Sequence, residues 1–282
     1  MLETGTCPWH RPWNKLTTYP QNYVSRRSYN GLNFLILTME GRELPFYLTY
    51  KQAHDLGGTV KKGERGMPIV YWQILKSKTQ TDQDGNPKKV PLLRYYTVFN
   101  ASQIDGIDFP TVPSRTGTEF NPITAAEAVV SNWRHAPTIE HGFNSARYCP
   151  ATDTIQMPSP GSFDTPAHYY ATLFHEIGHA TGHTSRLSRK IDNRFGSPDY
   201  SREELVAEMT SAFLCAHCGI DNSTTEQTTA YLASWIKALK GDPRLVVTAA
   251  SAAQKAANLI LGIGEMDTEQ DAKQPKPEEV AA

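Results

Sequence analysis

A chain of 282 residues with 39% hydrophobic side chains is long enough for two domains of ordinary size and apolar enough to bury a core. The absence of any run of about 18 apolar residues and of an apolar stretch near the start argues against a transmembrane helix and a secretory signal, so we expect a cytoplasmic protein without membrane contact. The net charge of −1 is unevenly spread: residues 1–110 carry 14 Lys and Arg against 9 Asp and Glu, whereas residues 111–282 carry 14 against 20.

A basic first part and an acidic second part predict two modules with different partners. We place the first module over residues 1–110 and a linker rich in proline, glycine, serine and threonine over residues 111–122. The second module follows over residues 123–264. Residues 265–282 contain few apolar side chains and are predicted to form a disordered tail.

The first module is predicted to be α+β with a mainly antiparallel sheet. An apolar run over residues 32–38 follows an Asn-Gly turn, residues 45–50 read as a strand, and a short helix begins near Thr49 and stops at Gly57-Gly58. Two β-rich runs, 67–75 and 94–100, flank the polar stretch 76–91. The Asp-Gly and Asn-Pro pairs in that stretch predict a hairpin with a long solvated loop.

The second module is predicted to be mostly helical. One short strand, over residues 154–157, is suited either to pairing with an extended peptide or to a structural role. Apolar residues at helical spacing predict helices over residues 124–135, 165–181, 201–218, 225–239 and 243–261.

The pattern His175-Glu176-Ile177-Gly178-His179 is the most informative in the chain. Residues four apart lie on one face of a helix, so two imidazoles at this spacing can bind one metal ion. Glu176 is then placed to take a proton from the water that the metal activates. Apolar residues around the motif indicate a buried helix, where an unpaired His-Glu-His face would be costly. We predict that His175 and His179 bind Zn²⁺, with Mn²⁺ or Co²⁺ as substitutes, and that Glu176 is catalytic.

A catalytic zinc site needs a third protein ligand, and two glutamates of the next helix are candidates. Glu208 lies within the apolar stripe of that helix, where a carboxylate needs a cation as its partner. Glu204 lies one turn earlier, but Ser201 and Glu204 have the spacing of a capping box, which gives Glu204 a structural explanation. We therefore prefer Glu208 as the ligand, with Glu204 as the alternative ligand or as a residue that orients a ligand histidine.

Two further residues are expected to line the pocket around the metal. His183 follows His179 by one turn, just past Gly182 where the helix is expected to end, so we interpret it as a cap or pocket residue. Tyr170 precedes the motif on the same helix and could donate a hydrogen bond to an oxyanion, although an aromatic residue there is equally suited to the core.

Aromatic and basic residues alternate through the first module. Single-stranded nucleic acid is bound by stacking of bases on aromatic side chains and by Lys and Arg along the backbone. A β-rich domain with an aromatic core and a basic surface has the same composition, so both interpretations stay open. The candidates for DNA contact are Trp9, Trp13, Arg26, Arg27, Tyr29, Lys51, Lys61, Lys62 and Arg65.

Together these patterns resemble the ArdC family of antirestriction proteins of conjugative plasmids. The first module carries the resemblance in Pro8-Trp9-x-x-Pro12-Trp13, Tyr29-x-Gly31-x-Asn33, Thr49-x-Lys51-Gln52, residues 57–64, and Val98-Phe99-Asn100 with Gln103. The second module carries it in residues 169–187, 203–208, 235–239 and 249–256. The chain departs from the family at Ala180, where many relatives have Trp, and we expect this to change packing near the site rather than metal ligation.

The resemblance implies that the first module binds single-stranded DNA, as a region shared with primase-like TraC proteins, and it adds Asn33 to the candidates for DNA contact. It implies a zincin-like metallopeptidase fold for the second module, acting on a host protein such as a component of a restriction system. Such a protein would protect incoming DNA and could be transferred to the recipient cell during conjugation. The alternative is a non-catalytic protein that coats single-stranded DNA, similar to a primase accessory, with a structural metal site.

Overall fold

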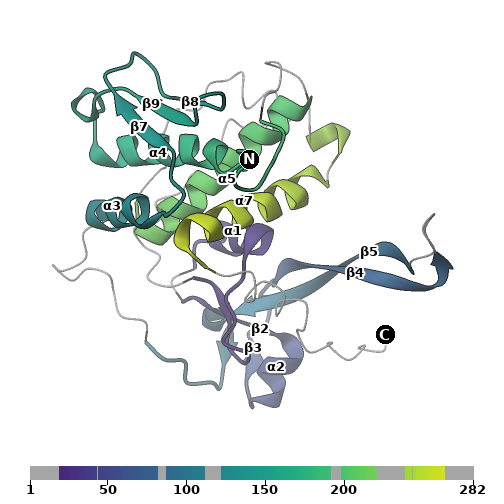
Figure 1. The fold of residues 1–282 in the computed structure, drawn as a ribbon. Coiled ribbons are helices and arrows are strands. Elements are labelled where there is room, and N and C mark those ends of the chain that lie inside the picture. Colours follow the sequence, from purple (N-terminus) through teal and green to yellow (C-terminus); the bar gives the residue numbers. More distant parts are fainter. Residues whose placement is uncertain are drawn as a thin grey trace.

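The computed structural model places the sheets of the first module beneath the helices of the second, and the two modules are in contact (Figure 1). It describes residues 19–42, 44–81, 87–111, 122–191, 198–220, 239–242 and 244–263. The expected helix over 225–239 falls almost wholly outside these residues, as do most of the linker and the tail. Within the described residues, no helix combines the length and the apolarity needed to cross a membrane.

The described part of the first module contains, in chain order, β1 (Gln21–Asn22), α1 (Gly31–Met39), β2 (Phe46–Thr49), α2 (Tyr50–Asp55), β3 (Thr59–Val60), β4 (Met67–Thr81), β5 (Pro87–Asn100), a short 3₁₀ helix (Ala101–Gln103) and β6 (Ile104–Asp105). The main sheet has the strand order β1-β2-β5-β4, and β3 pairs with β6 separately. Only β1 and β2 run parallel within the main sheet. The predicted α+β module with a mainly antiparallel sheet is therefore confirmed.

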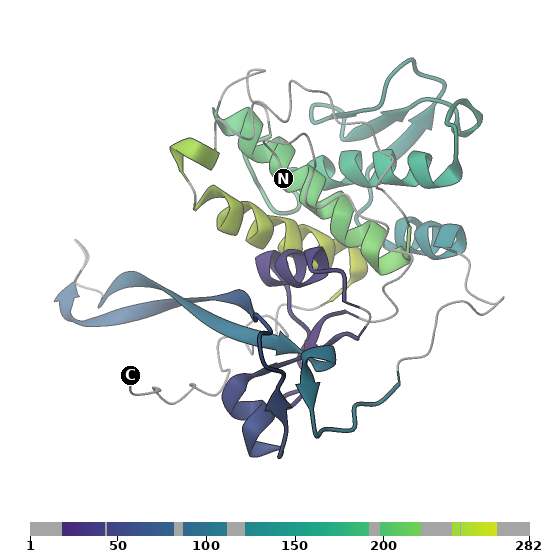
Figure 2. The same ribbon diagram turned by 180° about the vertical axis from the view of Figure 1, so that it is seen from behind.

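The hairpin of β4 and β5 is longer than predicted. The polar stretch 76–91 was expected to be a solvated loop, but the backbone pairing continues to Lys76 and Lys89 and resumes at Thr81 and Pro87 after an irregularity. A two-stranded ribbon is held by backbone hydrogen bonds and does not require apolar side chains, so polarity is a poor guide to where the loop begins. Figure 2 shows this ribbon extending away from the helices.

Helix α1 joins the two modules. The apolar run over 32–38 forms this helix, and its two faces serve different cores. Phe34 packs edge-on against Phe213 of the second module, with ring centroids 5.5 Å apart, and belongs to that module's core. Leu37 belongs to the core over the main sheet. The backbone N–H of Gly31 donates to Gln254 in the second module at 2.9 Å. The expected linker thus separates the modules along the chain but not in space.

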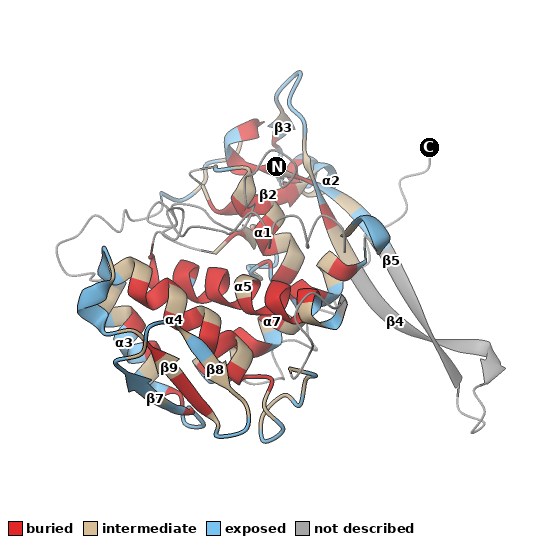
Figure 3. Ribbon diagram, turned by 90° about the horizontal axis from the view of Figure 1, so that it is seen from above, coloured by how far each residue is buried: buried red, intermediate tan, exposed pale blue. Residues whose placement is uncertain are grey.

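The second module packs helices against one another beneath a small sheet. Its described elements are α3 (Pro122–Asn132), β7 (Thr138–His141), β8 (Arg147–Cys149), β9 (Thr154–Met157), a short 3₁₀ helix (Pro160–Ser162), α4 (Pro166–Ala180), α5 (Pro198–Cys218) and α7 (Leu245–Leu261). The sheet order is β7-β9-β8, with β7 parallel and β8 antiparallel to β9. Buried residues run along α4, α5 and α7 (Figure 3). The prediction of a mostly helical module is confirmed.

Helices α4 and α5 approach each other closely at Gly178. A Cβ atom on Gly178 would lie 2.9 Å from the Cα of Ala207, which is closer than real Cβ contacts allow. The Ser211 hydroxyl of α5 also donates to the carbonyl of Ala171 in α4 at 2.8 Å. This close packing brings the first half of α5 against the C-terminal half of α4, where the HExxH pattern lies.

We predict that Phe34→Ala lowers the free energy of unfolding of the whole chain by about 3–5 kcal/mol, because the ring fills a core shared by both modules. Urea denaturation followed by circular dichroism and by tryptophan fluorescence should show one shifted transition. Leu56→Ala, at a position that is 48% exposed in the first module, is the control and should change stability little. Two separate unfolding transitions, of which Phe34→Ala shifts only the one that belongs to the first module, would contradict a core shared by both modules.

Candidate metal centre

The helix that carries the HExxH pattern has well-defined ends. The Thr165 hydroxyl accepts a hydrogen bond from the backbone N–H of His168 at 3.1 Å, and Pro166 occupies the first turn, where its missing N–H costs nothing. The helix ends at Ala180. Leu173, Phe174 and Ile177 are buried on its inner side, which fixes the face that turns toward α5.

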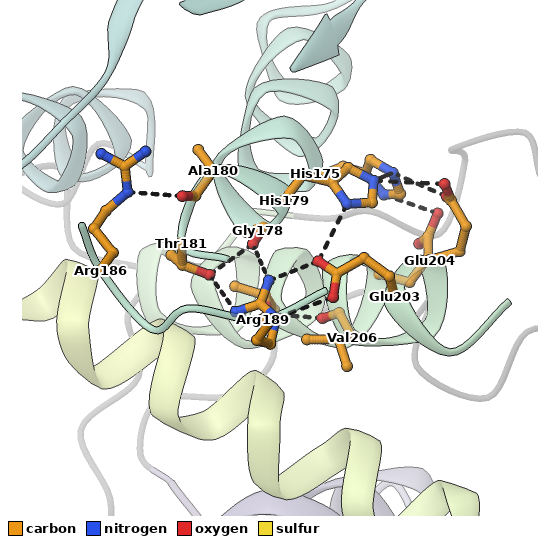
Figure 4. A network of polar contacts seen from close by, with 12 residues as sticks. His175, Gly178, His179, Ala180, Thr181, Arg186, Arg189, Glu203, Glu204 and Val206 are labelled. Atoms are coloured by element: carbon orange, nitrogen blue, oxygen red, sulfur yellow. Dashed lines mark hydrogen bonds and ion pairs between the residues drawn. The ribbon is translucent and has the colours of Figure 1, made fainter. Parts of the chain in front are cut away.

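His175 and His179 point their Nε2 atoms at each other, 3.1 Å apart. Glu204 of α5 faces the same point, because its carboxylate oxygens lie 3.4 Å from His175 Nε2 and 3.6 Å from His179 Nε2 (Figure 4). One ligand atom from each of the three residues lies within 4.8 Å of the others. Two imidazole nitrogens and one carboxylate oxygen form the donor set of a catalytic zinc site, so these residues fit a divalent cation.

Of the two carboxylates considered as the third ligand, the alternative, Glu204, is the one that lies near both Nε2 atoms. Glu208 lies 3.2 Å from His175 Nδ1, on the ring edge that faces away from Glu204. Ser201 and Glu204 do not form the expected capping box, because α5 begins at Pro198 and Ser201 is therefore inside the helix rather than at its N-cap. The carboxylate grouped with the two imidazoles is therefore that of Glu204, while Glu208 contacts the Nδ1 side of His175.

Glu203 contacts the second histidine in the same way, and it was not among the site residues expected from the sequence. Its Oε1 atom lies 3.4 Å from His179 Nδ1. Each imidazole therefore has a carboxylate on its Nδ1 edge, which fixes the tautomer that leaves Nε2 free to bind a metal. The signal in the sequence was the concentration of glutamates, at 203, 204 and 208, in the first half of a helix that is otherwise largely apolar.

The electrostatics of the cluster favour positive charge. Burial lowers the pKa of His175, but Glu208 and Glu204 outweigh it and hold this pKa well above its usual value. Burial raises the pKa of Glu204, but the hydrogen bond from His175 and the charge of His179 bring the net value below normal. The site thus keeps ionised carboxylates in a buried place, which a bound cation would stabilise.

Glu176 is buried, with 8% of its surface exposed. It follows His175 directly on α4, and its charge is close enough to help raise the pKa of that imidazole. This position is consistent with a carboxylate beside the metal rather than with a solvated helix face.

The two expected pocket residues have other partners. His183 Nδ1 lies 2.7 Å from the Ser185 hydroxyl, and His183 lines a cavity of about 580 Å³ that also includes Arg189 and Lys190. The Tyr170 hydroxyl donates to Glu127 of α3 at 3.3 Å, and burial together with this carboxylate raises the pKa of Tyr170 to about 12. The proposed donation by Tyr170 to an oxyanion is therefore not supported.

Two of the residues expected to contact DNA have structural partners within the first module. Tyr29 is buried against Tyr47, with its ring perpendicular and 6.3 Å away. The Asn33 amide donates to the carbonyl of Val70 at 2.8 Å and accepts from its N–H at 2.7 Å, which fastens α1 to β4. The Tyr29 ring is therefore buried within the first module, whereas Asn33 is partly exposed and stays a candidate for DNA contact.

The basic candidates lie at the surface of the first module. Arg26, Lys51, Lys62 and Arg65 are exposed, and Arg27 is partly exposed. Lys61 is exposed too, but its ammonium donates to the carbonyl of Ser102 at 2.9 Å. Trp9 and Trp13 lie outside the described residues.

Two exposed aromatic side chains of the first module were missed. Tyr50, at the start of α2, is 61% exposed, and Tyr95, on β5, is 67% exposed. Sequence alone cannot separate such rings from core rings, because both kinds occur in β-rich segments. Rings exposed in this way are suited to stacking with bases.

Comparison with protein families assigns both modules. Residues 1–99 match the N-terminal domain of anti-restriction factor ArdC, and residues 124–252 match the zincin-like metallopeptidase family. The zincin-like match covers the HExxH helix and the glutamates of α5.

Known relatives cover almost the whole chain. It is 37% identical to two proteins named DNA primase TraC from Escherichia coli, over 97% and 92% of its length, but it spans only 27% and 19% of theirs. It is also 37% identical to the uncharacterized protein y4eC of Sinorhizobium fredii (strain NBRC 101917 / NGR234), covering 89% of this chain and 83% of the relative.

Two solved structures share the fold. They are crystal structures of the antirestriction protein ArdC from plasmid R388, one metal-free and one Mn(II)-bound, at 36% and 35% identity, each with a TM-score of 0.71. The alignments cover 95% and 98% of this chain and 94% and 95% of those chains. The chain belongs to the ArdC family of antirestriction proteins, with an ArdC N-terminal domain followed by a zincin-like metallopeptidase domain.

Proposed function

We propose that this protein binds single-stranded DNA through its first module, carries a metal-dependent peptidase site in its second, and protects incoming DNA from host restriction. The observation that carries the peptidase part is the convergence of His175 Nε2, His179 Nε2 and the Glu204 carboxylate, with Glu176 beside them. The substrate would be a host protein, such as a component of a restriction system.

His175, His179 and Glu204 would hold the metal. Zn²⁺ is the ion expected for two imidazoles and one carboxylate, and Mn²⁺ or Co²⁺ can replace it in such a donor set. The Mn(II)-bound structure of the related ArdC protein supports a divalent ion in this fold. When bound, the ion supplies Lewis-acid activation of a water molecule and of the scissile carbonyl group.

The chain's own residues supply the proton transfers and the alignment. The Glu176 carboxylate would accept a proton from the attacking water and then deliver it to the amine that leaves. Glu208 and Glu203 would hold the two imidazoles by their Nδ1 atoms. The burial of Glu176 restricts access of bulk water to this carboxylate.

The DNA-binding part rests on the ArdC N-terminal match and on the surface of the first module. Lys51, Lys62 and Arg65 are exposed cations, and Tyr50 and Tyr95 are exposed rings. Cations along the backbone together with stacking rings are what single-stranded DNA requires.

A second candidate function is a DNA-coating protein whose metal site is structural. The observation that favours it is the name DNA primase TraC carried by two relatives, of which this chain spans only 27% and 19%. In that case the protein would work by covering DNA and would need no hydrolysis.

We predict that Glu204→Gln weakens Zn²⁺ binding by more than about 100-fold, whereas Glu208→Gln weakens it by about 10- to 100-fold, because Glu204 would bind the ion and Glu208 would only orient His175. Competition with a chelating dye measures both affinities. A larger loss of Zn²⁺ affinity in Glu208→Gln than in Glu204→Gln would indicate that Glu208 binds the ion.

We predict that Glu176→Gln retains one bound metal ion but loses protection of DNA, because the amide cannot accept the proton of the attacking water. Elemental analysis gives the metal content, and conjugation into restricting and non-restricting recipients gives the protection. Glu127→Gln makes the same chemical change on α3 and should protect as well as wild type. Undiminished protection by Glu176→Gln would favour the DNA-coating alternative.

We predict that Lys62→Gln combined with Arg65→Gln weakens binding of an oligothymidylate and flattens the slope of log affinity against log salt by about 1.4, since each lost phosphate contact removes roughly 0.7. Fluorescence anisotropy at several salt concentrations measures this slope. Lys240→Gln with Lys255→Gln removes the same charge from exposed positions of the second module and serves as the control. An unchanged slope in the first variant would place the DNA on another surface.

A further inference from the structure

The loop that follows the HExxH helix places an arginine at the back of the metal centre. Arg189 donates two hydrogen bonds to the Glu203 carboxylate: Nε lies 3.0 Å from Oε2 and Nη2 lies 2.7 Å from Oε1. The same guanidinium donates to the carbonyl of Gly178 and to the hydroxyl of Thr181, both at 2.8 Å (Figure 4). A bidentate pair of this kind fixes the orientation of the carboxylate plane in addition to balancing its charge.

The carboxylate that Arg189 holds is the one that holds a candidate metal ligand. Glu203 Oε1 takes the hydrogen bond from Arg189 Nη2 and also lies 3.4 Å from His179 Nδ1. The side chains of Arg189 and Glu203 are only 15% and 8% exposed, so solvent weakens this pair little. A continuous chain of polar contacts therefore runs from Arg189 through Glu203 to His179.

The backbone of the loop is shaped to present Arg189. The N–H of Leu187 donates to the carbonyl of Thr181 and that of Arg189 to the carbonyl of Gly182, each at 2.9 Å. Ser188, between them, has a backbone φ of 49°, which residues other than glycine rarely adopt. This unfavourable conformation lies immediately before Arg189, so the surrounding fold must hold it in place. The position of the guanidinium is fixed with it.

The competing explanation is that Arg189 only stabilises the loop, as Arg186 does. Arg186 lies on the same loop and donates to the carbonyls of Ala180 and His135, at 2.7 and 3.0 Å. It also pairs with Asp153. None of these partners is a member of the histidine and glutamate cluster, so Arg186 stabilises the loop without touching the site.

We propose that Arg189 is a positioning residue of the metal centre: it fixes Glu203, and Glu203 fixes the His179 imidazole with Nε2 turned toward His175 and Glu204. This inference rests on the proposed metal site. Arg189 itself would touch neither metal nor substrate. Its effect should therefore appear in the affinity for the metal rather than only in the stability of the fold.

The test is a Zn²⁺ titration of the full chain in competition with a chelating dye, together with thermal denaturation of each metal-free variant. Arg189→Gln should bind Zn²⁺ about 10- to 100-fold more weakly than wild type, as expected when the group that orients a ligand is lost. Arg189→Lys keeps the charge but not the bidentate hydrogen bonds, so its Zn²⁺ affinity should lie between those of wild type and Arg189→Gln. This variant also provides the test if Arg189→Gln does not fold. Arg186→Gln should lower the melting temperature yet bind Zn²⁺ nearly as tightly as wild type.

A double-mutant cycle separates the proposed chain of contacts from independent effects. Arg189→Gln combined with Glu203→Gln should lose little more affinity than Glu203→Gln alone, because both changes break the same connection. Wild-type affinity in Arg189→Gln, equal losses in the Arg189→Gln and Arg186→Gln variants, or fully additive losses in the cycle would each overturn the proposal. If wild type takes up no Zn²⁺, the proposed metal site fails first and this inference fails with it.

Discussion

The packing of α4 against α5 at Gly178 is the constraint on which the candidate metal centre depends. Because Gly178 has no side chain where it meets Ala207, the two helices come close enough for carboxylates of one to reach imidazoles of the other. The division of labour follows from this geometry: α4 supplies the nitrogen donors and the buried Glu176, and α5 supplies the carboxylates. A larger residue at 178 would push the helices apart and separate the two halves of the site.

The first module takes part in the same architecture through α1. Phe34 lies in the core of the second module and Leu37 in the core above the main sheet, so α1 contributes side chains to both cores. Asn33, on the same helix, is bonded through both amide atoms to the backbone of β4, and the long hairpin is thereby tied to this helix. The surface proposed to bind DNA and the proposed peptidase site are thus parts of one continuous packed structure rather than two domains on a flexible linker.

The sequence predicted the features that depend on local spacing. The HExxH helix, the short helix capped by Thr49, the antiparallel sheet and the strand at 154–157 all follow from periodicity, turn residues and capping. Features that depend on three-dimensional packing could not be obtained this way. Which of Glu204 and Glu208 faces the Nε2 atoms is decided by where α5 begins and how it rotates against α4. Whether Tyr29 is a core ring or a stacking ring is decided by what covers it.

We propose that His175, His179 and Glu204 together bind one divalent ion. Anomalous scattering from crystals soaked in Zn²⁺ or Mn²⁺ tests it most directly, because it locates the ion without assuming which side chains bind it. We expect a single strong peak between the two Nε2 atoms and the Glu204 carboxylate, with Glu208 and Glu203 remaining on the Nδ1 sides. A peak held by Glu208 instead, or no peak at this cluster in crystals that contain the metal, would contradict it.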